Sequence, residues 1–170
     1  AAICARLDGL PLALELAAAR IHMFSPQALR GHLEPPLDLL TTGARDLPDR
    51  HRTMRDAIAW SYDLLAPAEQ VLFRRLAVFE HGFRLDVAER VVPEVDLLDG
   101  VLSLINASLL FKAEIATDTE PRFQMLDVVR EYGIERLVES GEDATIRRRH
   151  AEAMRELARE ISERVWTSES

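Results

Sequence analysis

Apolar residues recur at helical spacing along most of the chain, and this spacing sets the main limit on its fold. Residues three and four apart lie on one face of an α-helix, and an apolar face must pack against another element. Prolines and glycines divide the pattern, because proline blocks the interior of a helix. The widest apolar face is formed by Leu97, Leu98, Val101, Leu102, Leu104 and Ile105. The pattern predicts helices over residues 2–7, 10–24, 26–33, 53–65, 67–79, 85–92, 96–107, 127–139 and 142–166.

The spacing changes in one region only. Residues 109–115 and 122–126 are typical of two strands, and the polar stretch 116–121 would join them as a hairpin. From Pro67 onward the order is therefore three helices, a strand, a turn and a strand, as in a winged helix-turn-helix. We predict a mainly α fold in three parts: a small helical bundle (1–65), a winged-helix domain with a two-stranded β-hairpin (66–140) and a long C-terminal helix (141–170).

The composition allows a folded core and gives no sign of a membrane span. Of the 170 residues, 48% are hydrophobic, and no apolar run approaches the roughly 20 residues that a transmembrane helix needs. Cys4 is the only cysteine, which excludes an internal disulfide and fits a reducing, cytoplasmic setting. The chain begins with Ala1, already in helical composition, so we expect it to be a segment of a longer protein.

The charge distribution argues against nucleic acid as a partner. The net charge is −8, from 21 basic and 29 acidic residues, whereas binding to nucleic acid depends on neutralising phosphates. No lysine or arginine lies between Val91 and Leu110, which includes the helix that a winged-helix reader would place in the major groove. We therefore expect this helix to pack against protein. The basic cluster at 147–150 is expected to be a solvated helix face with i,i+4 ion pairs.

Catalytic and metal-binding signatures are missing from the sequence. A phosphate-binding P-loop requires a lysine after a glycine-rich loop, but the sole lysine, Lys112, follows Phe111. The five histidines are scattered and form no ligand set, so no metal site is expected. No nucleophile motif is present either. We expect this segment to be non-catalytic and unable to hydrolyse ATP alone.

Three stretches, in order along the chain, resemble the signal-transducing ATPases known as STAND or NB-ARC proteins. They are LDGLPLALELAAAR (7–20), RHRTMRDAIAWSYDLLAPAEQVLFRRLAVFEHGF (50–83) and RFQMLDVVREYGIERL (122–137). The first matches the GLPLA motif of that family, and the third matches the end of its winged helix. The resemblance covers nearly the whole chain and implies a regulatory segment of such an ATPase, in a bacterial transcriptional regulator or signalling protein.

The resemblance further implies a nucleotide switch. An upstream P-loop NTPase domain would bind ATP or ADP, this segment would close over it, and helical repeats would follow downstream in the same chain. ADP or ATP would belong to the intact protein, with no cofactor expected for this segment alone. By the same match, Gly9, Leu10 and Pro11 would lie on the adenine side. A proline at a first helical position suits this corner, because its φ is preset and it needs no donor partner.

The phosphate side departs from the family pattern. Relatives carry Met-His-Asp, and their histidine reaches the β-phosphate of ADP, but the matching triplet here is Met125-Leu126-Asp127. Leu126 has no donor for that contact. Either Arg122 or Arg130 replaces it beside Asp127, or the ADP-bound state is held more weakly. Asp127 is also expected to cap the following helix.

Two other functions remain open at this point. The chain could be a stand-alone DNA-binding winged-helix transcription factor, although the acidic third helix argues against that function. It could also be a helical protein–protein adaptor, with the long last helix beginning a repeat array.

Overall fold

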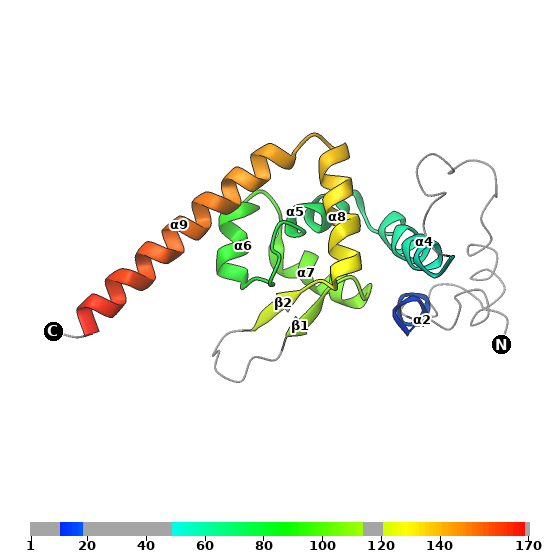
Figure 1. Cartoon of the computed structure of the whole chain (residues 1–170), viewed down its shortest axis with the longest axis horizontal. Helices are drawn as coiled ribbons and strands as arrows, with labels where there is room; N and C mark the ends of the chain where they lie inside the picture. The colour runs from blue at the N-terminus through cyan, green and yellow to red at the C-terminus, as the bar shows by residue number, and fades with distance from the viewer. Residues whose placement is uncertain (1–10, 19–48, 114–120, 169–170) are drawn as a thin grey trace. The chain divides into compact units, whose positions relative to one another are not determined.

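The computed structural model describes residues 11–18, 49–113 and 121–168 (Figure 1). The described residues form two compact units: one holds helices α2 (Pro11–Ala18) and α4 (Asp49–Asp63) with residues 106–109, and the other holds the rest. The predicted mainly α fold with one two-stranded hairpin is confirmed. The domain boundaries after residues 65 and 140 stay predictions. The helices predicted over 2–7 and 26–33 lie outside the described residues.

In the first unit, α2 and α4 pack side by side (Figure 1). Leu16 of α2 is buried, as are Ala57 and Ile58 of α4. Helix α2 starts at Pro11, where the absent N–H costs nothing because the first turn of a helix has no intrahelical acceptors. Helix α4 starts at Asp49, four residues before the predicted start at Thr53. The prediction followed apolar spacing, and the polar first turn of α4 carries none.

The second unit begins with three helices in the predicted winged-helix order (Figure 1). They are α5 (Pro67–Leu76), α6 (Leu85–Val91) and α7 (Leu97–Asn106). Pro67 occupies the first position of α5, and Oε2 of Glu69 accepts the Ala66 N–H at 2.8 Å, which satisfies one of the free donors at this helix start. Helix α5 ends at Leu76, short of the predicted Phe79, and a turn begins at Ala77.

Strands β1 (Phe111–Ala113) and β2 (Arg122–Gln124) form the antiparallel hairpin. In the pairing register, Phe111 is opposite Gln124 and Ala113 is opposite Arg122. Phe83, from the turn before α6, joins the hairpin by exchanging two backbone hydrogen bonds of 2.8 Å with Phe123. Gly82 makes this approach possible: its φ is +79°, and a Cβ there would lie 2.7 Å from the Phe123 carbonyl oxygen.

Helix α8 (Asp127–Glu139) has the predicted bounds and packs closely on α5. A Cβ on Gly133 would lie 2.7 Å from Cβ of Ala77 and 3.4 Å from the ring of Phe73, so the small residue sets the spacing of these elements. The buried side chains of α8 are Val129, Tyr132 and Leu137.

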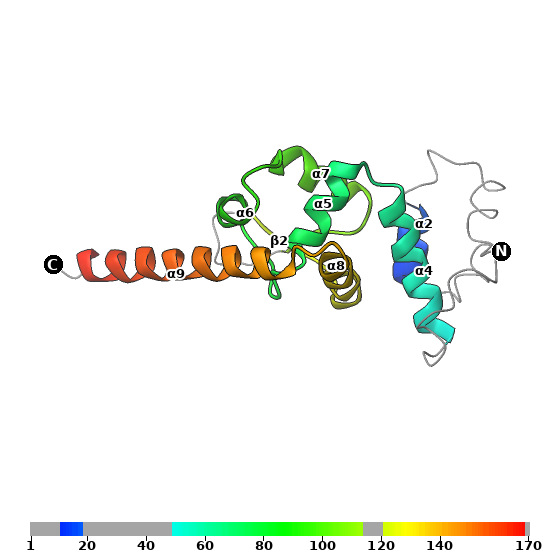
Figure 2. The same cartoon turned by 90° about the horizontal axis from the view of Figure 1, so that it is seen from above.

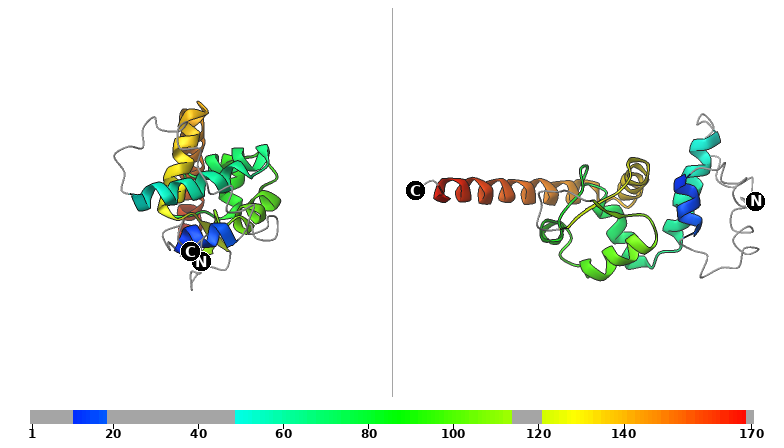
Figure 3. Two further views of the ribbon diagram at one scale, coloured as in Figure 1. Left: turned by 90° about the vertical axis from the view of Figure 1, so that its right-hand side faces the viewer. Right: turned by 90° about the horizontal axis from the view of Figure 1, so that it is seen from below.

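Helix α9 (Asp143–Ser168) follows a tight turn at Gly141 and runs as one continuous helix (Figure 2). It packs mainly on α6, and its Ile146 and Ala153 are buried. Its last turns extend past α6 and the hairpin (Figure 3, right). A search of the described residues for a helix long and apolar enough to cross a membrane found none.

Candidate functional site

The predicted adenine-side corner lies at the start of α2. Pro11 is the first residue of that helix and is exposed, so its ring is available to a ligand or a neighbouring protein surface. Gly9 and Leu10 lie outside the described residues. The structure therefore supplies one of the three predicted residues, in an exposed position.

The predicted phosphate-side residues lie where the hairpin meets α8. Arg122 begins β2 and is half-buried, while Asp127 and Arg130 lie on the first turn of α8. Nε of Arg130 is buried and has no hydrogen-bond partner among the residues that the structure describes. The pair Asp127 and Arg130 therefore places a carboxylate and an unpaired guanidinium nitrogen on one helical turn.

The predicted capping role of Asp127 is wrong. Leu126 occupies the cap position, with extended backbone and no side-chain cap, and Asp127 is already inside the helix. A cap side chain must stand one position earlier to reach the free N–H groups. At its observed position, the negative charge of Asp127 still favours the positive end of the helix dipole. Leu126 itself is exposed.

The outer face of α7 is apolar and lacks basic residues. Leu98 is 56% exposed and Leu102 is 50% exposed, whereas Leu104 is fully buried. The wide apolar face predicted for this helix is thus divided, with one half in the core and the other half at the surface. Asp96 and Asp99 are exposed beside the two leucines. Such a face suits contact with an apolar protein surface and repels phosphates.

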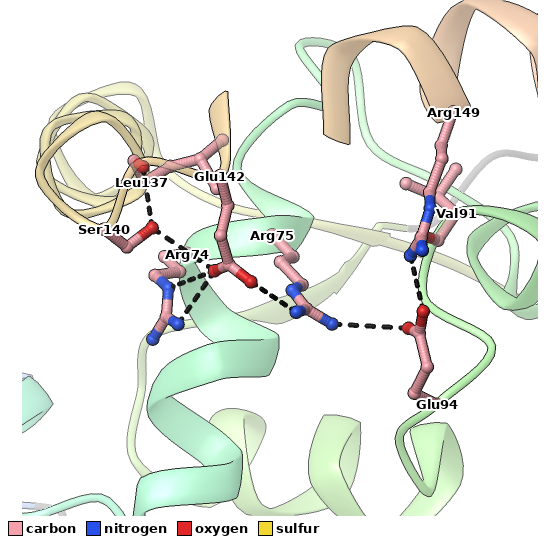
Figure 4. A network of polar contacts seen from close by, with 8 residues as sticks. All are labelled: Arg74, Arg75, Val91, Glu94, Leu137, Ser140, Glu142 and Arg149. Atoms are coloured by element: carbon pink, nitrogen blue, oxygen red, sulfur yellow. Dashed lines mark hydrogen bonds and ion pairs between the residues drawn. The ribbon is translucent and has the colours of Figure 1, made fainter. Parts of the chain in front are cut away.

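A chain of ion pairs joins α5, the α6–α7 loop and the start of α9 (Figure 4). We call it the charged seam and define it by its members, which alternate in sign: Arg74, Glu142, Arg75, Glu94 and Arg149. Each of its two carboxylates bridges two arginines.

Glu142, just before α9, binds both arginines of α5. Its Oε2 accepts from Nε of Arg74 at 2.8 Å, and its Oε1 accepts from Arg75. The Ser140 hydroxyl also lies 3.2 Å from Glu142. Glu94 then bridges the other end, 3.3 Å from Arg75 and 2.6 Å from Arg149. The seam therefore connects α5 to α9 partly through Glu94, which lies in the α6–α7 loop.

The arginines hold both carboxylates in the ionised form. For Glu142, the hydrogen bond from Arg75 lowers the pKa below its ordinary value, with a further contribution from Arg74, although burial opposes the shift. For Glu94, burial also favours the neutral form, but the hydrogen bond from Arg149 and the nearby positive charges hold the pKa of this carboxyl below its ordinary value.

A second group of ion pairs lies further along α9. Arg90 of α6 is 2.9 Å from Glu160 and 3.7 Å from Glu156. Between the seam and this group, the His150 ring meets Phe79 edge-on at 4.7 Å between ring centres. Burial lowers the pKa of His150, and the charge of Arg147 lowers it further. Helix α9 is therefore attached through alternating charged and apolar contacts.

The basic cluster at 147–150 is only partly the solvated face that we predicted. Arg147 forms the expected i,i+4 pair with Asp143 at 2.7 Å. Arg149 instead pairs with Glu94, which lies 55 positions earlier, and His150 is half-buried. The spacing held a signal for this: Arg149 lies three residues after Ile146 and four before Ala153, on the face that packs. No group of residues that could hold a metal ion occurs in the described ranges.

Comparison with known proteins finds relatives in mycobacteria, while no family model matches the chain. The protein named "Putative HTH-type transcriptional regulator Rv0890c" of Mycobacterium tuberculosis is 39% identical over 165 residues, which is 94% of this chain and 18% of that protein. A Mycobacterium bovis protein named "Putative HTH-type transcriptional regulator Mb0914c" matches equally. The "Uncharacterized protein Rv0894" of M. tuberculosis is 38% identical over 151 residues, 86% of this chain and 38% of that protein.

The chain spans about a fifth of the length of the first two relatives. The similarity extends over both compact units, since it covers nearly the whole of this chain. This chain is therefore a homologue of one segment of mycobacterial proteins, among them proteins named as HTH-type transcriptional regulators.

Proposed function

We propose that this chain is a non-catalytic regulatory segment of a bacterial transcriptional regulator, and that its winged-helix unit contacts protein rather than DNA. The outer face of α7 carries this proposal. A winged-helix protein that reads DNA places its third helix in the major groove, and affinity comes largely from lysine and arginine at the phosphates. Helix α7 offers Leu98, Leu102 and Asp99 instead.

The finer proposal is a nucleotide relay of the STAND type. In that arrangement a P-loop domain elsewhere in the intact protein binds ADP or ATP, and this segment closes over the nucleotide. One observation supports it: Pro11 is exposed at the start of α2, where a docked neighbour could reach it. The relatives named as HTH-type regulators are several times longer than this chain, which leaves room for such a domain.

Two binding measurements test this division of roles. Isothermal calorimetry of the 170-residue chain with ADP is expected to show no binding, because the chain lacks a P-loop. Fluorescence anisotropy with duplex DNA at low salt is expected to show no saturable binding either. Tight binding of ADP to the segment alone would contradict the nucleotide relay, and sequence-specific DNA binding would contradict the protein-docking role of α7.

DNA binding by this winged helix is the second candidate, and the names of the relatives favour it. If the segment were the DNA-reading part of such a regulator, replacing Leu98 and Leu102 by alanine would change DNA affinity. A gel shift at low salt with genomic fragments provides that test. On our proposal, the same double variant alters only association with protein.

A further inference from the structure

We propose that α9 is a detachable arm, held on the winged-helix unit by the charged seam and released when the seam is screened or neutralised. The proposal concerns a conformational device and stands independently of the proposed function. It follows from how α9 is attached, from the sharing of each seam carboxylate, and from the small apolar contact beneath this helix.

The ion pairs that hold α9 are spread along the helix. Glu142 ties its start to α5, Arg149 ties its second turn to Glu94, and Glu160 ties a more distal turn to Arg90. From Asp143, the residue after Glu142, to Glu160 the helix advances about 26 Å, at about 1.5 Å per residue. The attachment therefore resembles a row of separate charged contacts, of which Figure 4 shows those of Glu142 and Arg149.

Each seam carboxylate pairs with two arginines, so losing one carboxylate removes two ion-pair partners. Arg74 and Arg75 share Glu142, and Arg75 and Arg149 share Glu94. Without the two carboxylates, three arginines would face one another with no negative charge between them. Like charges at short range repel, so the seam would change from attractive to repulsive.

The apolar contact under α9 is small by comparison. Among the α9 side chains that the structure describes, 143–163, Ile146 and Ala153 are buried, and the apolar Met154 and Leu157 are half-buried. The seam arginines and carboxylates also remain partly exposed to solvent. Partly exposed ion pairs are weak one by one and are screened by salt. Docking of α9 should therefore depend on ionic strength, while the apolar packing of α8 should not.

The experiment measures the distance between α6 and α9 in the 170-residue chain by pulsed electron paramagnetic resonance. Spin labels are placed at Glu89→Cys and Arg159→Cys, both exposed positions, after Cys4→Ser removes the native thiol. A second pair, Glu89→Cys with Glu131→Cys, reports on the winged-helix unit without α9. The seam variant is Glu94→Gln with Glu142→Gln. The matched control, Glu135→Gln with Glu152→Gln, removes the same charge outside the seam.

We expect the seam variant to raise the fraction of long, broadly distributed α6–α9 distances by about tenfold. Raising salt from about 0.01 M to about 1 M shortens the Debye length from about 30 Å to about 3 Å. In the chain with an unmodified seam, this should also raise the fraction of long α6–α9 distances. The Glu89–Glu131 label pair should keep a narrow distance distribution under every condition. The control variant should keep a narrow α6–α9 distance distribution. A narrow α6–α9 distance in both the seam variant and high salt overturns the proposal. Broadening of the distance distributions of both label pairs also overturns it, because the rest of the winged-helix unit would then unfold together with the release of α9.

Discussion

Helices α8 and α9 follow each other in the chain and pack on the same unit, but by different interactions. Helix α8 meets α5 through close apolar packing, with Gly133 fitted against Ala77. Helix α9 meets α6 through ion pairs and an apolar strip, and Glu142, just before α9, adds ion pairs to α5. Burial of a large apolar side chain stabilises by about 1.5–3 kcal/mol, whereas a partly exposed ion pair contributes about 0.2–1 kcal/mol. The comparison indicates a permanent α8 and a releasable α9.

The largest effect should come from the α8 side of this comparison. Leu137→Ala removes a fully buried side chain and should lower the free energy of unfolding by about 2–5 kcal/mol, through lost burial and a cavity. Val138→Ala, one position along at an exposed site, should change it by less than about 0.5 kcal/mol. Urea unfolding followed by circular dichroism measures both. Equal effects of the two variants would show that α8 does not pack as described.

Gly133→Ala tests the close approach of α8 to α5. The added Cβ would lie 2.7 Å from Cβ of Ala77, and neither atom can rotate away, so the helices must move apart. We expect a loss of about 1–3 kcal/mol in the same urea experiment. An unchanged or raised stability would mean that the α5–α8 spacing is looser than this contact requires.

Ile146→Ala removes a buried side chain from α9, for comparison with Leu137→Ala on α8. Ile146 of α9 is buried as completely as Leu137 of α8. If α9 separates before the body unfolds, the variant can cost no more than the docking free energy, so we expect a loss below about 2 kcal/mol. A loss as large as that of Leu137→Ala would contradict separate release of α9.

Acid should weaken the docking of α9 in two steps. Burial lowers the pKa of His150, so docking of α9 favours the neutral ring. The stability that this gives is fully present above the ordinary pKa of about 6.5, and it is lost as the pH falls through the lower pKa of the folded state. The pKa values of Glu94 and Glu142 are also lowered, so their contribution is lost at lower pH, below about 4.5. Hydrogen exchange of α9 amides across this range measures both steps. His150→Leu should abolish the first step alone.

The smallest effect on stability is expected on the outer face of α7. Leu98→Ala with Leu102→Ala should change the free energy of unfolding by less than about 0.5 kcal/mol per site, because both side chains are already about half exposed. A larger loss in urea unfolding would show that these leucines are covered in solution. If stability is unchanged, any loss of partner binding by this double variant reports on the surface of α7 and not on folding.

The sequence predicted elements more successfully than contacts. The bounds of α8 were predicted in full, since its helical spacing lies between a strand and a glycine turn. The charged seam was not predicted, because Glu94 and Arg149 are 55 positions apart and meet only through the packing of α9. The exposure of Leu98 and Leu102 was also not predicted. The apolar face of α7 is wider than the part that packs on the core, and the sequence does not show which leucines lie outside that part.

The candidate site shows the same limit on a smaller scale. The absence of basic residues on α7 could be read directly from residues 91–110. The error at Asp127 was a shift of one position: the helix begins at Asp127, so Leu126 takes the place where a capping oxygen would be needed. Local composition thus identified the kind of surface, while side-chain roles depended on the precise helix start.

Native-state hydrogen exchange of the whole chain compares the two helices within one sample. We predict that α9 amides exchange through a low-energy opening that becomes easier as salt rises, while the buried turns of α8 exchange only when the unit unfolds. The same opening free energy for α8 and α9, unchanged by salt, would contradict the distinction between a permanent and a releasable helix.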